Sequence, residues 1–219
     1  MFNLIMKDLR IIKRSMLYVV PIFLVINFII YKVTLGDYNN VYVYLYSVIF
    51  MSYFCFVSME TYKNKWETMI INSFPISRKH IILLKYITLI IYNLFFSVLA
   101  VLETILLKLL SIDGGTIADF RILLMSLLIS FIYFSIYIPF STKNLEKTNK
   151  VNVIMYILMI LLPQIMDKIP KTIIGKNIIS FIIKIDNVNG ILFFIAIITI
   201  LIYIISYFIS VKIYINKDF

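Results

Sequence analysis

The chain has few of the residues that break helices, form disulfides or bind metals. Its 219 residues include 5 Gly, 5 Pro, 1 Cys and 1 His. So few helix breakers favour long helices. The single cysteine, Cys55, excludes an intramolecular disulfide. Because one His and one Cys cannot form the cluster that a zinc protease needs, we expect no metal site.

Enzyme motifs are missing too. The sequence holds no G-x-x-x-x-G-K-[ST] phosphate loop, since Gly175-Lys176-Asn177 lacks both the leading glycine and the hydroxyl residue. It also holds no G-x-S-x-G of serine hydrolases. We therefore expect no catalytic residue, no cofactor bound by this chain and no enzymatic activity of the chain by itself.

The chain is rich in long hydrophobic runs. Hydrophobic residues make up 62% of it, and its mean hydropathy is +0.99, far above a soluble domain. The sequence thus predicts an all-α integral membrane protein. The net charge of +10 would suggest nucleic acid in a soluble protein. Here the cations flank apolar runs, so we expect topology signals and contacts with lipid headgroups, and no nucleic-acid binding.

We predict one transmembrane domain over residues 1–219. Residues 1–15 have apolar Phe2, Ile5 and Leu9 at helical spacing with basic residues on the other face, which predicts an amphipathic helix lying on the membrane. Six apolar runs then follow that are long enough to cross a bilayer: 16–31, 41–59, 86–107, 122–140, 151–166 and 190–211.

The loops set the expected orientation. Lys and Arg are roughly twice as frequent on the side that holds the two termini, which predicts cytoplasmic termini. The longest loop on the other side, 167–189, contains two apolar clusters too short to span. These form either short extracellular helices at the outer leaflet or a packed loop over the bundle.

Polar groups inside the predicted spans are few. Asn27, Asn93 and Glu103 are candidates to line a substrate pathway. A charge at Glu103 is costly in a membrane, which by default indicates function. The competing explanation, which we favour, is an ion pair with Lys108 or Lys32 close to the interface.

Residues 60–85 form a polar interruption between the second and third spans. This segment contains Trp66, the only tryptophan. Its first part has helical spacing, Pro75 breaks the helix, and Ser77 is a candidate N-cap for the next one. We expect a short helix held between two spans that can pass force from a soluble partner into both.

This segment also carries a family resemblance. The run Asn72-Ser73-Phe74-Pro75-Ile76-Ser77-Arg78 resembles the N-S-[LF]-P-[IV]-[ST]-R segment of ABC-2-type permeases, the membrane subunits of type V ABC exporters. The opening run 4–9 and the closing run 210–214 resemble the same family, as does the six-span layout.

The resemblance implies a pathway made by two permease subunits, here a homodimer, above two ATPase subunits that bind MgATP. It assigns residues 60–85 as a coupling segment, with a second contact between spans four and five. The residues expected to contact the ATPase are Tyr62, Lys63, Trp66, Glu67, Met69, Ile70, Asn72, Phe74, Pro75, Ser77, Arg78, Lys143, Asn144 and Glu146.

Within this family the chain resembles small Gram-positive permeases, including exporters of amphipathic cytolytic peptides such as phenol-soluble modulins. That resemblance implies a bacterial cytoplasmic membrane, outward transport and an amphipathic peptide substrate. Two alternatives stay open: a substrate-capture subunit of a vitamin importer, which also has six spans, and a membrane scaffold that transports nothing.

Overall fold

The structure, a computed structural model, describes residues 2–33, 39–62, 77–112, 117–118, 120–143, 152–154, 156–157 and 188–216. Within these ranges all regular structure is helical. The long helices are α1 (Phe2–Val33), α2 (Asn39–Tyr62), α4 (Arg78–Leu109), α5 (Phe120–Lys143) and α8 (Val188–Ile215).

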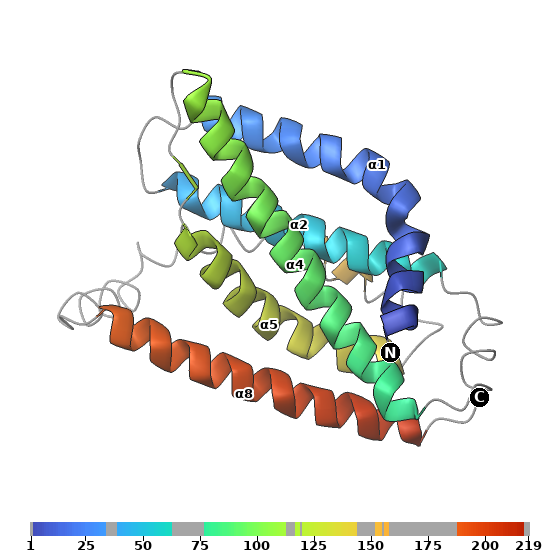
Figure 1. The fold of residues 1–219 in the computed structure, drawn as a ribbon. Coiled ribbons are helices and arrows are strands. Elements are labelled where there is room, and N and C mark those ends of the chain that lie inside the picture. The colour runs from blue at the N-terminus through green and yellow to red at the C-terminus, as the bar shows by residue number, and fades with distance from the viewer. Residues whose placement is uncertain are drawn as a thin grey trace.

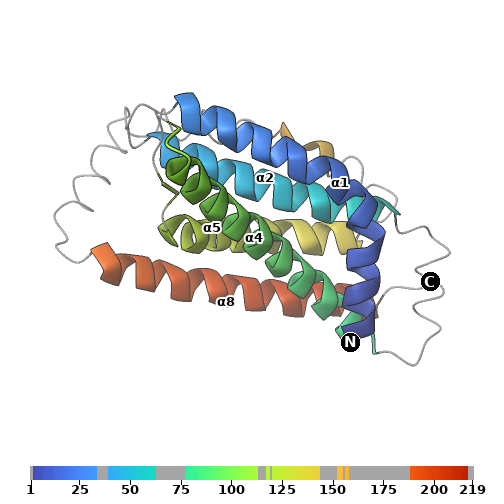
Figure 2. The same cartoon turned by 45° about the horizontal axis from the view of Figure 1, so that its top comes forward.

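Helix α4 lies at the centre of the bundle. It crosses the other helices obliquely, with α1 and α2 on one side and α5 and α8 on the other (Figure 1 and Figure 2). It contacts each of these four helices. Helices α5 and α8 lie side by side. The beginnings of α1 and α4 and the ends of α2, α5 and α8 share one end of the bundle, which we name the basic end.

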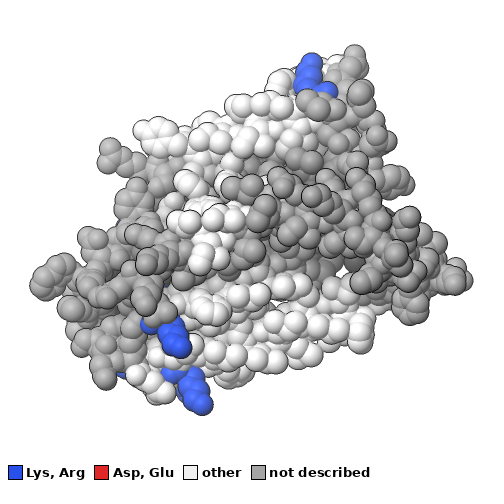
Figure 3. Space-filling view, turned by 180° about the vertical axis from the view of Figure 1, so that it is seen from behind, with Lys and Arg blue, Asp and Glu red and all other residues white. Residues whose placement is uncertain are grey.

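The helices have the length and polarity that a bilayer requires. Arg78–Leu109, Leu123–Lys143 and Phe193–Ile215 are long and apolar enough to cross a membrane, and Met16–Lys32 and Tyr44–Ser58 are shorter apolar helices. In Figure 3 the blue Lys and Arg atoms lie at opposite ends, and the described surface between them on the face shown has no charged residue. The predicted all-α membrane fold is confirmed.

Two helices extend beyond the apolar runs that were predicted as spans. The interfacial helix 1–15 and the first span are one continuous helix, α1, which bends so that its first turns run at an angle to the rest (Figure 1). Pro21 lies inside α1, and proline removes one backbone hydrogen bond, a common cause of bending. Likewise α4 begins at Arg78, directly after the predicted N-cap Ser77, and continues without a break into the predicted span that starts at residue 86.

Parts of the predicted layout lie outside the described residues: most of the fifth span (151–166), residues 167–187 of the loop 167–189, and the segments 63–76 and 144–150. Of the fifth span, residues 152–154 and 156–157 are helical. They pack on α5, since the Tyr137 hydroxyl donates to Asn152 Oδ1 at 2.7 Å.

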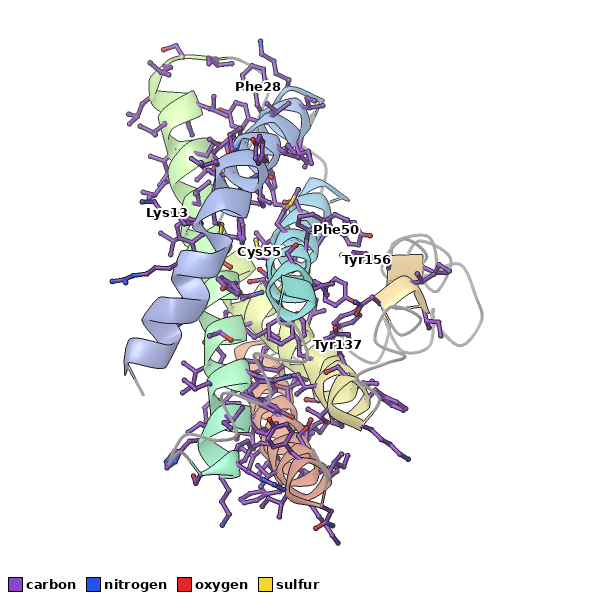
Figure 4. The ribbon with its side chains drawn as sticks, turned by 90° about the vertical axis from the view of Figure 1, so that its right-hand side faces the viewer. Lys13, Phe28, Phe50, Cys55, Tyr137 and Tyr156 are labelled. Carbon is purple, nitrogen blue, oxygen red and sulfur yellow. The ribbon has the colours of Figure 1, made fainter. Side chains whose placement is uncertain are left out.

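Aromatic rings fill the space between α2 and α5. Tyr53 is fully buried, and its ring makes edge contacts with Tyr133 and Tyr137, with centroids 5.4 and 5.3 Å apart. Phe50 lies 6.1 Å from Tyr156, and Figure 4 shows Phe50, Tyr137 and Tyr156 converging from their three segments. Such tilted pairs stabilise beyond the area that they bury.

Candidate functional site

The predicted coupling segment 60–85 includes the end of α2 and the start of α4, which both lie at the basic end (Figure 1 and Figure 2). Tyr62 ends α2, and Arg78 begins α4. Lys143, from the second predicted contact, ends α5. The other predicted ATPase contacts, Lys63, Trp66, Glu67, Met69, Ile70, Asn72, Phe74, Pro75, Asn144 and Glu146, lie outside the described residues.

Ser77 occupies the predicted N-cap position, but its hydroxyl does not cap the helix. Its backbone is extended, with φ −64° and ψ 139°, and its carbonyl accepts the His80 N–H at 2.9 Å. The hydroxyl instead lies 2.6 Å from His80 Nδ1. The imidazole three residues on therefore takes the place of the backbone N–H that a capping serine usually binds.

Arg78 attaches the start of α4 to the end of α8. Its Nη1 donates to the carbonyl of Ile215 at 2.7 Å, and Ile215 is the last residue of α8. The final carbonyls of a helix lack partners within the helix and carry partial negative charge. The guanidinium group of Arg78 supplies both a hydrogen-bond donor for the final carbonyl and a positive charge beside the helix end.

The basic end carries most of the described exposed cations. Arg10, Lys13, Lys79, Lys143 and Lys212 are exposed there. The opposite end has exposed Lys32 and Lys108. This uneven distribution is the one expected when the basic end faces the cytoplasm.

Two candidates for the substrate pathway meet in the Asn27 cluster, made of Asn27, Ser47 and Glu103. Asn27 is fully buried. Its Nδ2 donates to Glu103 Oε2 at 3.3 Å, and its Oδ1 accepts the Ser47 hydroxyl at 3.0 Å. The cluster joins α1, α2 and α4 about 9 Å, or six residues, from the ends of α1 and α4.

The expected ion pair of Glu103 is wrong. Among the described residues its partner is Asn27, and no ion pair joins it to Lys108 or Lys32. Lys108 is five residues further along α4, which turns it about 140° away around the helix axis. Glu103 is half-buried, and its hydrogen bond to Asn27 is directed along the interior side of α4 toward α1.

Asn93 belongs to a separate group, the Asn93 cluster, made of Asn93, Ser97, Ser126 and Ser130. Asn93 Nδ2 donates to Ser130 Oγ at 2.6 Å, and Oδ1 accepts the Ser126 hydroxyl at 3.2 Å. Ser97 and Ser126 lie 2.9 Å apart. All four side chains are fully buried, so this cluster joins α4 to α5 and is closed.

A third group, which we had not predicted from the sequence, is the Tyr86 network: Tyr86 on α4, Ser135 on α5, and Tyr203, Ser206 and Ser210 on α8. Tyr86 Oη lies 2.8 Å from Ser206 Oγ and 2.9 Å from Ser210 Oγ. One signal was available: Tyr203, Ser206 and Ser210 recur at spacings of three and four, which places hydroxyls on one face of an otherwise apolar span.

Comparison with known proteins yields one match. A family model described as ABC-2 family transporter protein matches residues 3–215, nearly the whole chain. No curated protein and no solved structure matches it.

Proposed function

Because the chain belongs to the ABC-2 family of transporter proteins and is a permease subunit of an ABC transporter, we propose that it exports an amphipathic peptide. The transport runs from the cytoplasm or the inner leaflet outwards. A separate ATPase dimer binds and hydrolyses MgATP, and two copies of this chain form the pathway in a bacterial plasma membrane.

One observation supports the coupling part of this proposal: the end of α2 at Tyr62 and the start of α4 at Arg78 both lie at the basic end, and Arg78 binds the end of α8. A partner that binds between Tyr62 and Arg78 acts on α2, α4 and α8 together. Trp66 and Phe74 are the large apolar side chains that we assign to the ATPase groove, because buried aromatic residues dominate such contacts.

The polarity of the described spans supports an amphipathic substrate. Their core is largely aromatic and aliphatic, and several of its buried Asn and Ser side chains bond one another, whereas a polar cargo would need polar groups to replace its water. Glu103 supplies one carboxylate near the outer end of the bundle, which we assign to a cationic side chain of the peptide, with Asn27 positioning it. Asn93 has a packing role, since its amide is engaged inside the Asn93 cluster.

The two alternatives fit less well. A vitamin-capture subunit needs a binding pocket for its solute and lacks a comparable coupling segment. A membrane scaffold that transports nothing would not be expected to have the sequence of a transporter family. The ABC-2 family model matches this chain over residues 3–215.

The test is co-purification with the ATPase encoded beside this chain, followed by peptide-stimulated ATP hydrolysis in proteoliposomes. Trp66→Asp or Phe74→Asp should abolish stimulation while the protein still inserts, because a charge cannot fill an apolar groove. Leu110→Asp places the same charge at an exposed site at the opposite end of α4 and should have no effect. The absence of a stable ATPase complex would refute the exporter.

A further inference from the structure

Polar contacts connect α4 to α8 at several points along the two helices. Arg78 Nη1 binds the Ile215 carbonyl. Tyr86, about 12 Å further along α4, contacts Ser206 and Ser210. The Tyr203 hydroxyl donates to the Tyr86 carbonyl at 3.0 Å. Residues later in α4 contact residues earlier in α8. This order is the one expected for two antiparallel helices packed in one fixed register.

The direction of these hydrogen bonds follows from the donor count. Ser206 donates its single proton to the Ser135 carbonyl at 2.6 Å, since a carbonyl can only accept. Tyr86 must then donate to Ser206, and Ser210 must donate to Tyr86. The result is one ordered chain, Ser210 to Tyr86 to Ser206 to the backbone of α5, whose members polarise one another.

Ring packing holds the same residues in place. The centroids of Tyr86 and Tyr203 lie 4.9 Å apart, and those of Tyr86 and Tyr207 lie 5.6 Å apart, both in edge contacts. Tyr203 in turn stacks on Phe131 of α5 at 4.5 Å. Tyr86 is thus fixed by two hydroxyl groups, its own carbonyl and two rings.

We infer that Arg78 and Tyr86 are positioning residues that make α4 and α8 move as one body, so that force entering at Ser77 reaches the last span as well as the helix that it directly precedes. This inference rests on the proposed coupling function. The positions suit this role, since Arg78 lies within the predicted coupling segment 60–85, and Tyr86 is the first residue after that segment, about two turns further along α4.

The first experiment measures distance and needs no ATPase. Spin labels replace the exposed Lys79 and Lys212 in a Cys55→Ala background, and double electron–electron resonance is recorded in nanodiscs. The wild-type network should give a narrow distribution, and Tyr86→Phe, which removes two hydroxyl contacts, should broaden it. Thr88→Val is the matched control, because Thr88 is equally buried but its hydroxyl bonds only the Leu84 and Lys85 carbonyls within α4.

Milder variants keep the test decisive if Tyr86→Phe folds poorly. Ser210→Ala should broaden the distribution less, and Ser210→Thr, which keeps the hydroxyl, should restore it. A Tyr86→Phe or Ser210→Ala distribution as narrow as the wild type would overturn the inference. Independent motion of α4 and α8 in the wild-type protein, seen as a broad distribution, would overturn it too.

The second experiment uses the complex with the ATPase and a dye-labelled amphipathic helical peptide as probe. In Tyr86→Phe, peptide exported per ATP hydrolysed should fall at least about threefold, as expected from losing two interhelical hydrogen bonds. A merely structural network would lower export and hydrolysis in the same proportion, which would overturn the inference. If no ATPase complex forms, the proposed function fails, and the distance measurement still decides the inference by itself.

Discussion

The Asn27 and Asn93 clusters place an asparagine amide between helices in two different ways. The Asn93 cluster lies at the midpoint of α4, contains only neutral groups, and is fully buried. The Asn27 cluster lies near the opposite end from the coupling segment and contains a carboxylate that is half-exposed. Hydroxyl and amide groups that satisfy one another hold membrane helices together. A carboxylate with one amide partner retains acceptor capacity for a ligand.

The largest expected effect comes from placing a charge in the closed Asn93 cluster. Asn93→Asp should destabilise the protein by about 3 kcal/mol, because an acidic side chain at the centre of a span costs that much. The measurement is denaturant-induced unfolding in mixed micelles. Asn216→Asp makes the same change at an exposed site after α8 and should cost below about 1 kcal/mol. If Asn93→Asp and Asn216→Asp lowered the free energy of unfolding equally, the Asn93 cluster would not be closed to water.

Removing the charge of the other cluster should affect transport and leave stability nearly unchanged. Glu103→Gln keeps the side-chain length and a hydrogen bond to Asn27, so the free energy of unfolding should stay within about 0.5 kcal/mol. Export of a lysine-rich amphipathic peptide should fall about tenfold, since a charge-assisted hydrogen bond is lost.

The control for Glu103→Gln is a peptide of the same helical pattern with glutamine in place of lysine. Export of that peptide should be equal in the wild type and the variant. A tenfold loss for both peptides would mean that Glu103 acts on the pathway as a whole, and no loss for either would remove it from substrate binding.

The smallest expected effect comes from trimming the closed cluster. Ser130→Ala removes one hydrogen bond to Asn93 and should cost about 0.6 kcal/mol, the average for such bonds between membrane helices. Export per ATP should not change in the folded protein. If Ser130→Ala lost export without losing stability, the Asn93 cluster would also take part in transport, like the Asn27 cluster and against what its burial indicates.

Helix positions were predictable from the sequence because apolar length and charge are local properties. The start of α4 could be read from its N-cap position Ser77, and the apolar helix Met16–Lys32 coincides with the first apolar run. Both helices are longer than their apolar parts: Arg78 to Lys85 precede the apolar run of α4, and α1 is continuous from Phe2. A hydropathy pattern marks where a chain is soluble in lipid, and backbone hydrogen bonding continues past that limit.

The clusters were less predictable, because partners such as Asn27 and Glu103 stand 76 residues apart. Which side chains meet depends on how each helix is rotated about its axis, and a span apolar on all sides gives little indication of that rotation. Glu103 could be singled out by its charge, and its place in a substrate pathway stays a prediction. Its partner was wrong because Lys108, although near in sequence, lies on another face of α4.

The length of α4 also relates the protein to the thickness of its bilayer. Thirty-two residues extend about 48 Å, whereas the hydrocarbon core is about 30 Å thick and the whole bilayer about 40–45 Å. The cations at its two ends, Arg78 and Lys108, are separated by about 45 Å along the axis, so each can reside in a headgroup layer. Thinner membranes would force α4 to tilt further, and because α4 contacts every other long helix described, lipid chain length would alter the whole bundle through this one element.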